Sequence, residues 1–501
     1  MSGSGLLAAG LVCLVCPVAT AAGAEPEMTV SSAAQLYAVR SPTGGTVIAR
    51  RRMTTTLGVS VYDLYDRAAE PAAPSLSLRA RLRYDADYGG TAAETDLTNP
   101  SRLVPGFDRG PIDLMYGYVE GRRFLGGCLG FKLGRQYVVD SLGWWSFDGG
   151  EVKVTTPFFV AAELYGGLEQ RGGLALSTPR FEREGVWRGD RTGYDPSLYP
   201  AFQPSAIAPA YGAALESSGL RWLRARLSYR RVDNTGASNA TALANGVRPT
   251  LSYGPTRVSS ERVGLGVDAT VGDVGALKSG LAYDLYAARL ANLYASADAF
   301  ASRTLTLSLD YDYFVPTFDA DSIWNFFLAM PSSDLGLRAS WEATDHLSLA
   351  GGARARAFSV QTTNDVADSS PNGLATAGYA PNSSVDLMGG ADLAARWRFG
   401  EGALGARGNA DFADNGERLG VDFYGERTLE TRYVVSARAG VWQWDDRLRP
   451  DRDAVSFQYV AGVGYKLPPR SLVYFDFEHD MNRIAGQRYR AMLWLSLAVS
   501  R

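Results

Sequence analysis

Apolar and polar residues alternate with a period of two over most of the chain, and this alternation predicts β-strands. In the clearest run, residues 76–88, Leu, Ala and Tyr fill every even position while Ser, Arg and Asp fill every odd one. Successive side chains of a strand point to opposite faces, so one face is apolar and the other is charged. Strands that cross a bilayer need about 9–11 residues, whereas strands are usually about five or six residues long. The run is therefore typical of a transmembrane barrel strand with lipid on one side and water on the other.

The same alternation returns almost to the carboxyl end, and its phase never drifts within a run, which excludes amphipathic helices. It predicts twenty candidate strands: 52–66, 75–89, 111–121, 127–138, 150–156, 159–168, 210–217, 222–232, 261–271, 277–297, 303–315, 334–342, 347–358, 385–399, 403–412, 418–427, 432–444, 454–467, 471–480 and 488–500. The predicted fold class is therefore all-β, a transmembrane antiparallel up-and-down β-barrel.

Short and long connections alternate, as in outer-membrane barrels with short periplasmic turns and long outer loops. Twenty strands break this rule in the first half, because three long connections, 90–110, 169–209 and 233–260, would then lie in the periplasm. Two boundaries must therefore be wrong: one within 277–297, which can hold two strands, and one before residue 76. We expect about 16–22 strands, in an even number.

Aromatic residues support this orientation of the barrel. Five of them lie beside predicted short turns, where the membrane interface favours amphipathic rings: Trp341, Trp397, Phe399, Tyr433 and Tyr465.

The amino-terminal residues predict an exported protein. An apolar stretch at residues 6–18 is followed by small residues that end at Ala24, which is typical of a cleaved signal peptide at 1–24. Residues 25–45 are mixed in character and predict a periplasmic lead or a short first strand, which leaves 46–501 as a single barrel domain. Two of the three cysteines lie in the signal, so Cys128 has no partner for a disulfide.

Composition adds mainly exclusions. The net charge of −3 does not point to nucleic acid, and no apolar run reaches the roughly 18 residues of a helical membrane span. The only histidines are His346 and His479, and nothing in the sequence pairs a serine with either of them as a hydrolase would require. His479 lies between Glu478 and Asp480, but neighbours along a strand face opposite sides and cannot converge on one metal ion. We expect no catalytic residue, no metal site and no cofactor.

Residues 117–137, with Tyr-Val-Glu-Gly-Arg at 118–122 and Leu-Gly-Arg-Gln at 133–136, are followed by Phe-Asp-Gly-Gly at 147–150. With these pieces the chain resembles the Gram-negative outer-membrane porin-type β-barrels. The resemblance implies passive diffusion of small hydrophilic solutes, contact with outer-membrane lipid and insertion by the barrel-assembly machinery. Such barrels typically end in an aromatic residue, whereas this sequence ends in Ser500 and Arg501.

The charged strand faces are expected to line a pore. The candidate pore-lining residues are Arg79, Arg81, Arg83, Asp85, Asp87, Arg224, Arg226, Arg230, Asp310, Asp312, Arg354, Arg356, Arg396, Arg398, Asp476 and Glu478. With Asp386 and Asp392 included, ten arginines oppose eight carboxylates. Rings of basic residues favour anions and rings of carboxylates favour cations, so this near balance predicts a weak preference for anions.

Two aromatic segments are candidates for a constriction. In residues 316–327, Asp319 and Asp321 could narrow the pore while Trp324 stacks on a sugar. Residues 141–150, with Trp144 among them, allow the same interpretation. The alternative for both segments is a loop that only anchors the outer rim, since aromatics near the interface are common in such barrels.

Three functions therefore compete. A diffusion pore needs an open polar lumen, which the charged faces supply. A structural or adhesive barrel would have a lumen filled by its own loops, and residues 169–209 are long enough to fill one. An enzyme would need a convergent catalytic group, which the sequence lacks. The sequence favours the porin-like channel, and it leaves the solute and any homo-oligomer open.

Overall fold

The computed structural model describes residues 24–64, 73–87, 112–170, 208–234, 257–317, 331–360, 384–414, 416–447, 451, 453–468 and 470–500. Strands dominate these ranges, and no helix in them is long and apolar enough to cross a membrane. The strands are β1 (Glu25–Arg40), β2 (Thr46–Tyr62), β3 (Ser75–Asp87), β4 (Ile112–Phe124), β5 (Leu129–Asp140), β6 (Gly143–Thr155), β7 (Val160–Glu169), β8 (Pro209–Ser217), β9 (Leu223–Asn234), β10 (Arg257–Val271), β11 (Gly275–Asp284), β12 (Arg289–Phe300), β13 (Leu305–Phe314), β14 (Ser332–Glu342), β15 (Leu347–Val360), β16 (Ser384–Phe399), β17 (Gly402–Ala413), β18 (Gly416–Leu429), β19 (Tyr433–Asp446), β20 (Ala454–Leu467), β21 (Ser471–Asn482) and β22 (Gly486–Ser500).

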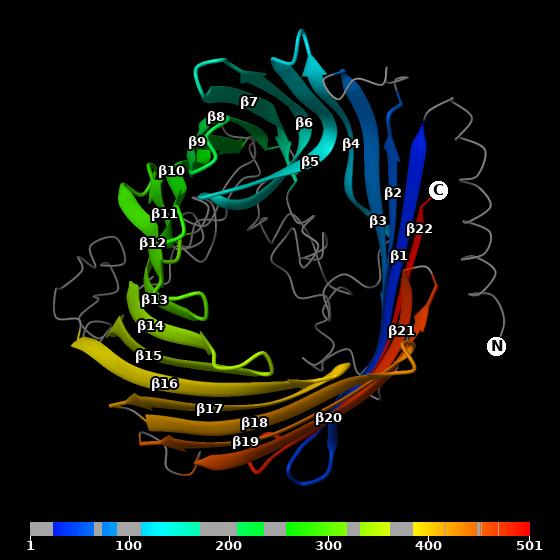
Figure 1. Cartoon of the computed structure of the whole chain (residues 1–501), viewed down its shortest axis with the longest axis vertical. Coiled ribbons are helices and arrows are strands. Elements are labelled where there is room, and N and C mark those ends of the chain that lie inside the picture. The colour runs from blue at the N-terminus through cyan, green and yellow to red at the C-terminus, as the bar shows by residue number, and fades with distance from the viewer. Residues whose placement is uncertain are drawn as a thin grey trace, which may run out of the picture.

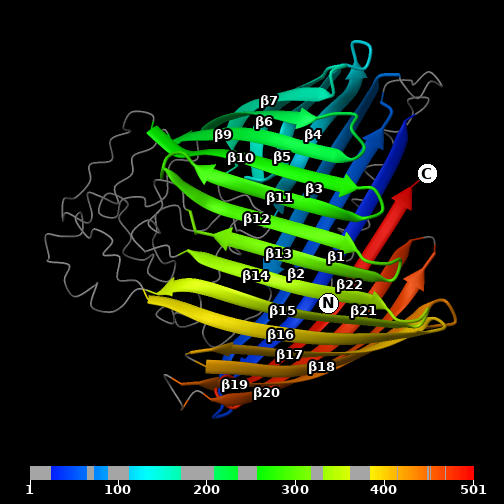
Figure 2. The same cartoon turned by 60° about the vertical axis from the view of Figure 1, so that its left-hand side comes forward.

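These strands form one closed antiparallel barrel (Figures 1 and 2). Each strand pairs with the next in sequence, and β1 also pairs with β22 from Glu27↔Ser500 to Arg40↔Gln487. Closure removes the unpaired edges that an open sheet would expose. The described residues thus confirm the predicted fold class, with 22 strands at the upper end of the expected range.

The first correction concerns residues 25–45, which we predicted as a periplasmic lead or a short first strand. Residues 25–40 are instead the full-length strand β1, hydrogen-bonded on both sides. The apolar alternation is weak here because Ser and Ala fill much of the strand, so the pattern did not reveal it. This strand supplies the boundary that was missing before residue 76.

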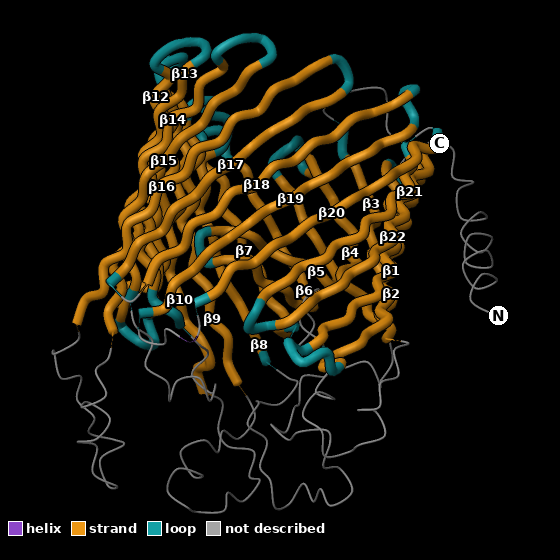
Figure 3. The backbone as a smooth tube through the Cα atoms, turned by 90° about the horizontal axis from the view of Figure 1, so that it is seen from below, coloured by secondary structure: helices purple, strands orange, loops and turns teal. Residues whose placement is uncertain are grey.

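The second correction lies within 277–297, which forms the two strands β11 and β12 joined by a turn at residues 285–288. With both corrections, the long connections 88–111, 170–208, 235–256, 315–331 and 361–383 all follow odd-numbered strands. They therefore leave the barrel at the end opposite to β1's first residue and β22's last. Turns of a few residues join most strands at the other end, as Figure 3 shows.

The outer face of the barrel is apolar. On β16, for example, Leu387 and Leu393 are 64% and 72% exposed, while the arginines of this strand lie on the opposite face. The predicted aromatic residues also face outward near short turns: Tyr433 contacts Tyr465 at 5.2 Å between ring centroids, and Trp341 is exposed at the end of β14. An apolar band with aromatic residues at its border is what a bilayer requires of a spanning barrel.

Candidate functional site

The β5–β6 hairpin leaves the barrel wall before it reaches its turn. Pairing of β4 with β5 ends at Gly117↔Arg135, and pairing of β6 with β7 begins at Phe147↔Glu169. Between these points the strand residues of segment 136–146, which we call the hairpin tip, pair only within the β5–β6 hairpin. Figure 1 shows this hairpin running inside the ring of strands toward β10.

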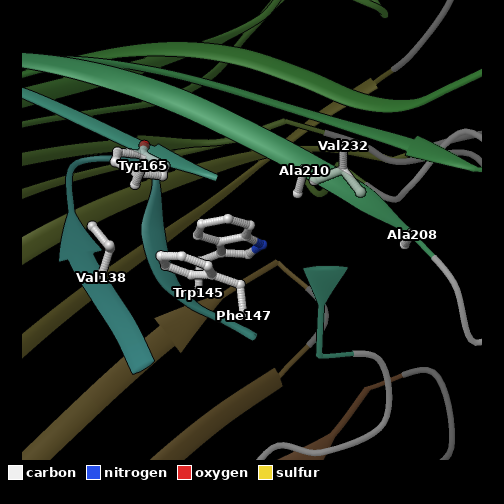
Figure 4. Close-up of a cluster of buried hydrophobic side chains, with 7 residues drawn as sticks. All are labelled: Val138, Trp145, Phe147, Tyr165, Ala208, Ala210 and Val232. Carbon is white, nitrogen blue, oxygen red and sulfur yellow. The ribbon is translucent and has the colours of Figure 1, made fainter. Parts of the chain in front are cut away.

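One face of the hairpin packs against the inner wall. Phe147 is fully buried, its ring stacks on Trp145 at 4.4 Å between centroids, and both contact Tyr165 of β7 (Figure 4). The complete cluster is Val138, Trp145, Phe147, Tyr165, Ala208, Ala210 and Val232. Small residues on β8 and β9 leave room for the large rings, so the tip is held by apolar burial on β7–β9.

The turn of the hairpin reaches three further strands. Leu142 packs with Ala282 of β11 and Ala291 of β12, and its carbonyl oxygen accepts a hydrogen bond of 3.0 Å from Arg230 Nη2. Gly264 on β10 has no side chain where Leu142 lies, and a Cβ there would come within 2.7 Å of the leucine Cδ2. Because Gly264 has no Cβ, the turn of the hairpin can pack directly against β10.

Polar groups around the tip form hydrogen bonds within the same packing only in part, since Gln136 Oε1, Asp140 Oδ2, Ser141 Oγ and Arg230 Nη1 are buried without a hydrogen-bond partner among the described residues. Trp145 Nε1 donates to Glu169 Oε1 at 3.0 Å, and the guanidinium of Arg230 lies 5.1 Å from the centre of the Trp145 ring. Arg230 was predicted to line the pore, but it is buried beneath the hairpin and stabilises the hairpin's position. Alternation along β9 could not reveal this, because the covering segment lies far away in the sequence.

The opposite face of the tip is turned away from the wall. It carries Tyr137, Val139 and Trp144, all of which are exposed. Tyr137 contacts Tyr116 of β4 at 5.8 Å between centroids. Tyr116 pairs with Arg81, on the charged face of β3, so this face of the tip looks onto the inner surface of β4.

The predicted pore-lining residues of β3 lie on the inner face, and most of them have a partner of opposite charge in the described ranges. Arg81 donates to Thr56, and Arg79 lies over the Tyr62 ring at 5.3 Å and near Tyr118 and Glu120. Arg83 pairs with Asp113 at 3.2 Å and is almost buried. Asp85 accepts hydrogen bonds from Arg52 and Thr54 across β2.

A polar cavity of about 520 Å³ lies beside the hairpin, and Tyr137, Glu163 and Arg226 are among the residues that line it. Arg226 bridges Glu163 at 2.6 Å and Glu216 at 2.8 Å, and Lys153 also pairs with Glu216. Lys132 and Glu151 form a further ion pair at 2.9 Å. The sequence pattern selected Arg226 but missed this network, whose acids and lysines occur singly on short strands.

The wall from β14 to β18 carries the predicted arginines in exposed ion pairs. The pairs are Arg354–Asp411, Arg356–Asp334, Arg396–Glu426 and Arg398–Glu342. Their arginine side chains are about 39–49% exposed, so water reaches this inner face.

The remaining candidates lie apart from one another. Glu478 pairs with Arg488 and Arg490, and Asp476 accepts from Trp494 Nε1 at 3.2 Å. Arg224, Asp310 and Asp312 lie on the inner faces of β9 and β13. The side chain of Asp87, and Asp319, Asp321 and Trp324 entirely, lie outside the described residues, as does most of the predicted signal peptide.

The described residues contain no cluster of three or more His, Cys, Asp or Glu side chains that could hold a metal ion. His479 faces outward, stacked on Tyr489 at 4.3 Å between centroids and hydrogen-bonded to Tyr459. Its carboxylate neighbours in sequence point to the other side of the sheet, as the alternation predicts.

In the described residues the chain forms a closed barrel of 22 antiparallel strands with an apolar exterior, a charged interior and a hairpin folded inward, which is the architecture of a membrane-spanning β-barrel. No family profile matches the chain, and no curated protein matches it in sequence. Among solved structures it is similar to OccK9 (OpdG) of Pseudomonas aeruginosa, with a TM-score of 0.44, 9% identity and coverage of 96% of this chain and 99% of that one. It is also similar to OccAB2 of Acinetobacter baumannii, with a TM-score of 0.43, 8% identity and coverage of 96% and 98%. A BenF-like porin from Pseudomonas fluorescens is similar with a TM-score of 0.40, 8% identity and coverage of 96% of this chain and 99% of that one.

Proposed function

We propose that the protein is a porin-like channel for passive diffusion of small hydrophilic solutes, with a weak preference for anions. The observation that carries this proposal is the exposed charged inner face of β14–β18. A lumen packed solid by its own wall would bury these side chains, because an unpaired or half-paired charge away from water is costly. Their exposure supports a water-filled path along this side of the barrel.

The weak selectivity follows from ion pairing. Arg354, Arg396 and Arg398 each lie against a carboxylate, so their fields largely cancel beyond a Debye length of about 8 Å at physiological salt. On β3, Arg81 donates to Thr56, while Arg79 lies over the Tyr62 ring and near Tyr118 and Glu120. Glu120 also pairs with Arg122, so this group still has more arginines than carboxylates on the inner face. Basic residues of this kind favour anions.

The competing proposal is a structural or adhesive barrel with a filled lumen. The inward hairpin favours it to a degree, because the hairpin occupies space on one side of the interior. The hairpin covers β7–β12, however, and leaves the inner face of β14–β18 exposed. A channel is therefore more consistent than a filled barrel with both the covered strands β7–β12 and the exposed strands β14–β18.

Reconstitution of the purified protein into a planar bilayer tests this function. We expect single-channel steps, and a reversal potential under a tenfold potassium chloride gradient that indicates a small excess of chloride over potassium permeability. Arg79→Ser with Arg81→Ser should move the reversal potential toward cation selectivity, whereas Arg427→Ser, on the outer face near a short turn, should leave it unchanged. Absence of conductance would favour the filled barrel, and strong cation selectivity in the unmodified protein would contradict the charge argument.

A further inference from the structure

The exposed face of the hairpin tip carries a group of aromatic rings that the packing of the hairpin does not use. Tyr137 and Trp144 are diagonal neighbours on this face, with ring centroids 6.3 Å apart and ring planes inclined by 19°. The two side chains are 41% and 44% exposed, although their strand neighbours Val138 and Trp145 are buried. Tyr116 borders this pair at 5.8 Å from Tyr137, with its ring plane inclined by 59°. The rings form an aromatic shelf, which we define as Tyr116, Tyr137 and Trp144.

A charged fork lies beside the shelf on the same face. Arg135 donates to both carboxylate oxygens of Asp148, from Nε at 2.7 Å and from Nη2 at 2.9 Å. Its Nη1 donates to the carbonyl oxygen of Leu114, which lies beyond the last β4–β5 pair. The guanidinium is thereby fixed, while Asp148 remains 45% exposed and keeps free lone pairs.

The spacing suits one ring of a polyhydroxylated solute. Arg135 and Tyr137 are two residues apart on β5, which separates their side-chain rows by about 6.6 Å along the strand. A molecule that lies flat on the shelf therefore presents its edge to the fork. The C–H face of a pyranose meets the negative face of an aromatic ring favourably, and its hydroxyls can donate to Asp148.

The charge of the fork selects among ring-bearing solutes. Arg135 and Asp148 cancel each other, and the exposed atom is a carboxylate oxygen. The carboxylate of an aromatic acid would be repelled by this oxygen. A neutral sugar instead has hydroxyl groups that can donate hydrogen bonds to it.

We propose that the aromatic shelf and the Arg135–Asp148 fork form a binding site for neutral sugars on the lumen side of the inward hairpin. The site rests on the proposed channel function, since solute would reach it through the lumen. A bound sugar would slow its own passage and reduce the current that small ions carry past the hairpin.

Binding and conduction are measured separately. Tryptophan fluorescence of the detergent-solubilised barrel is titrated with maltotriose, and with a polyethylene glycol of similar mass that has no pyranose face. Current block by maltotriose is then measured in planar bilayers. We expect saturable binding and block by maltotriose and neither by the polyethylene glycol.

Variants locate the site. Tyr137→Ala and Asp148→Asn should weaken binding and block by roughly tenfold, which corresponds to the loss of about 1.4 kcal/mol. Trp222→Ala, in the exposed turn between β8 and β9, is the matched control and should bind like the unmodified protein. Unchanged heat-modifiable migration on gels and unchanged conductance in sugar-free salt show that each variant is folded.

The outcomes separate the two proposals. Binding without conductance upholds the sugar site and overturns the channel. Conductance without maltotriose binding, binding that survives Tyr137→Ala and Asp148→Asn, or binding of benzoate in preference to maltotriose overturns the sugar site and leaves the channel standing.

Discussion

Two stretches of the barrel wall have the same strand alternation but differ in what lies on their inner face. Over β7–β12 the inner face is covered by the β5–β6 hairpin, and its residues are packed as in the core of a soluble protein. Over β14–β18 the inner face consists of exposed ion pairs. The same alternation therefore produces two kinds of wall. In the covered wall, β7–β12, the inner face contacts protein, and in the open wall, β14–β18, it contacts water.

The covered wall should be the more sensitive to loss of volume. Phe147→Ala removes a fully buried ring from between Trp145 and Tyr165, and we expect a loss of about 3–5 kcal/mol in the stability of the hairpin packing. Urea unfolding in detergent, followed by near-ultraviolet circular dichroism, measures it. Phe158→Ala, at an 80% exposed turn position, is the control and should change stability little. Equal effects of the two changes would mean that the hairpin is not packed on the wall.

The open wall should separate its two faces sharply. Leu393→Arg places a charge on the lipid side of β16 and should impair insertion by about 2–4 kcal/mol if the site is near the bilayer midplane. Arg396→Ser, three residues further along the same strand, removes an inner-face charge that is 48% exposed and should be tolerated. The measurement is the folded fraction after refolding into lipid vesicles. If both variants fold equally well, the assignment of inside and outside is wrong.

A matched pair of arginines compares the two inner faces directly. Arg226 lies between Glu163 and Glu216 with its side chain only 21% exposed, so Arg226→Met removes the partner of the buried Glu163 and one partner of the partly buried Glu216, and it should cost about 1–3 kcal/mol. Arg398→Met breaks a pair with Glu342 in which both side chains are about half exposed, and it should cost at most about 1 kcal/mol. Urea midpoints at low and high salt measure both. A larger effect at Arg398 would contradict the division into a covered and an open wall.

Sequence alternation predicted the open wall well, because lipid on one side and water on the other impose contrasting residues. The expected strands 385–399 and 403–412 correspond to β16 (Ser384–Phe399) and β17 (Gly402–Ala413). Where both faces meet protein, the contrast disappears. Strand β6 begins at Gly143 instead of at residue 150, because Trp144 and Trp145 place large rings on both of its faces.

The candidate site was predicted only in part. Residues 141–150 were expected either to enter the pore or to anchor the rim, and the structure places the hairpin inside the barrel. No local pattern reveals that β5 separates from β4 at Arg135, since that choice depends on cavities left by distant residues such as Gly264 and Ala282. The second candidate, with Asp319, falls outside the described residues and stays a prediction.

The pairing of β1 with β22 has a consequence for how the barrel can form. This pairing places Arg40 beside Gln487, so the barrel is closed at this seam by contacts between residues that are far apart in the sequence. The entropy lost on closing such a loop grows only as about 1.5 RT times the logarithm of its length, but contacts this distant form slowly. The seam is also where a circular permutation is most natural, since a short linker across β22 and β1 would let new ends be cut at the β14–β15 turn without removing any strand pair.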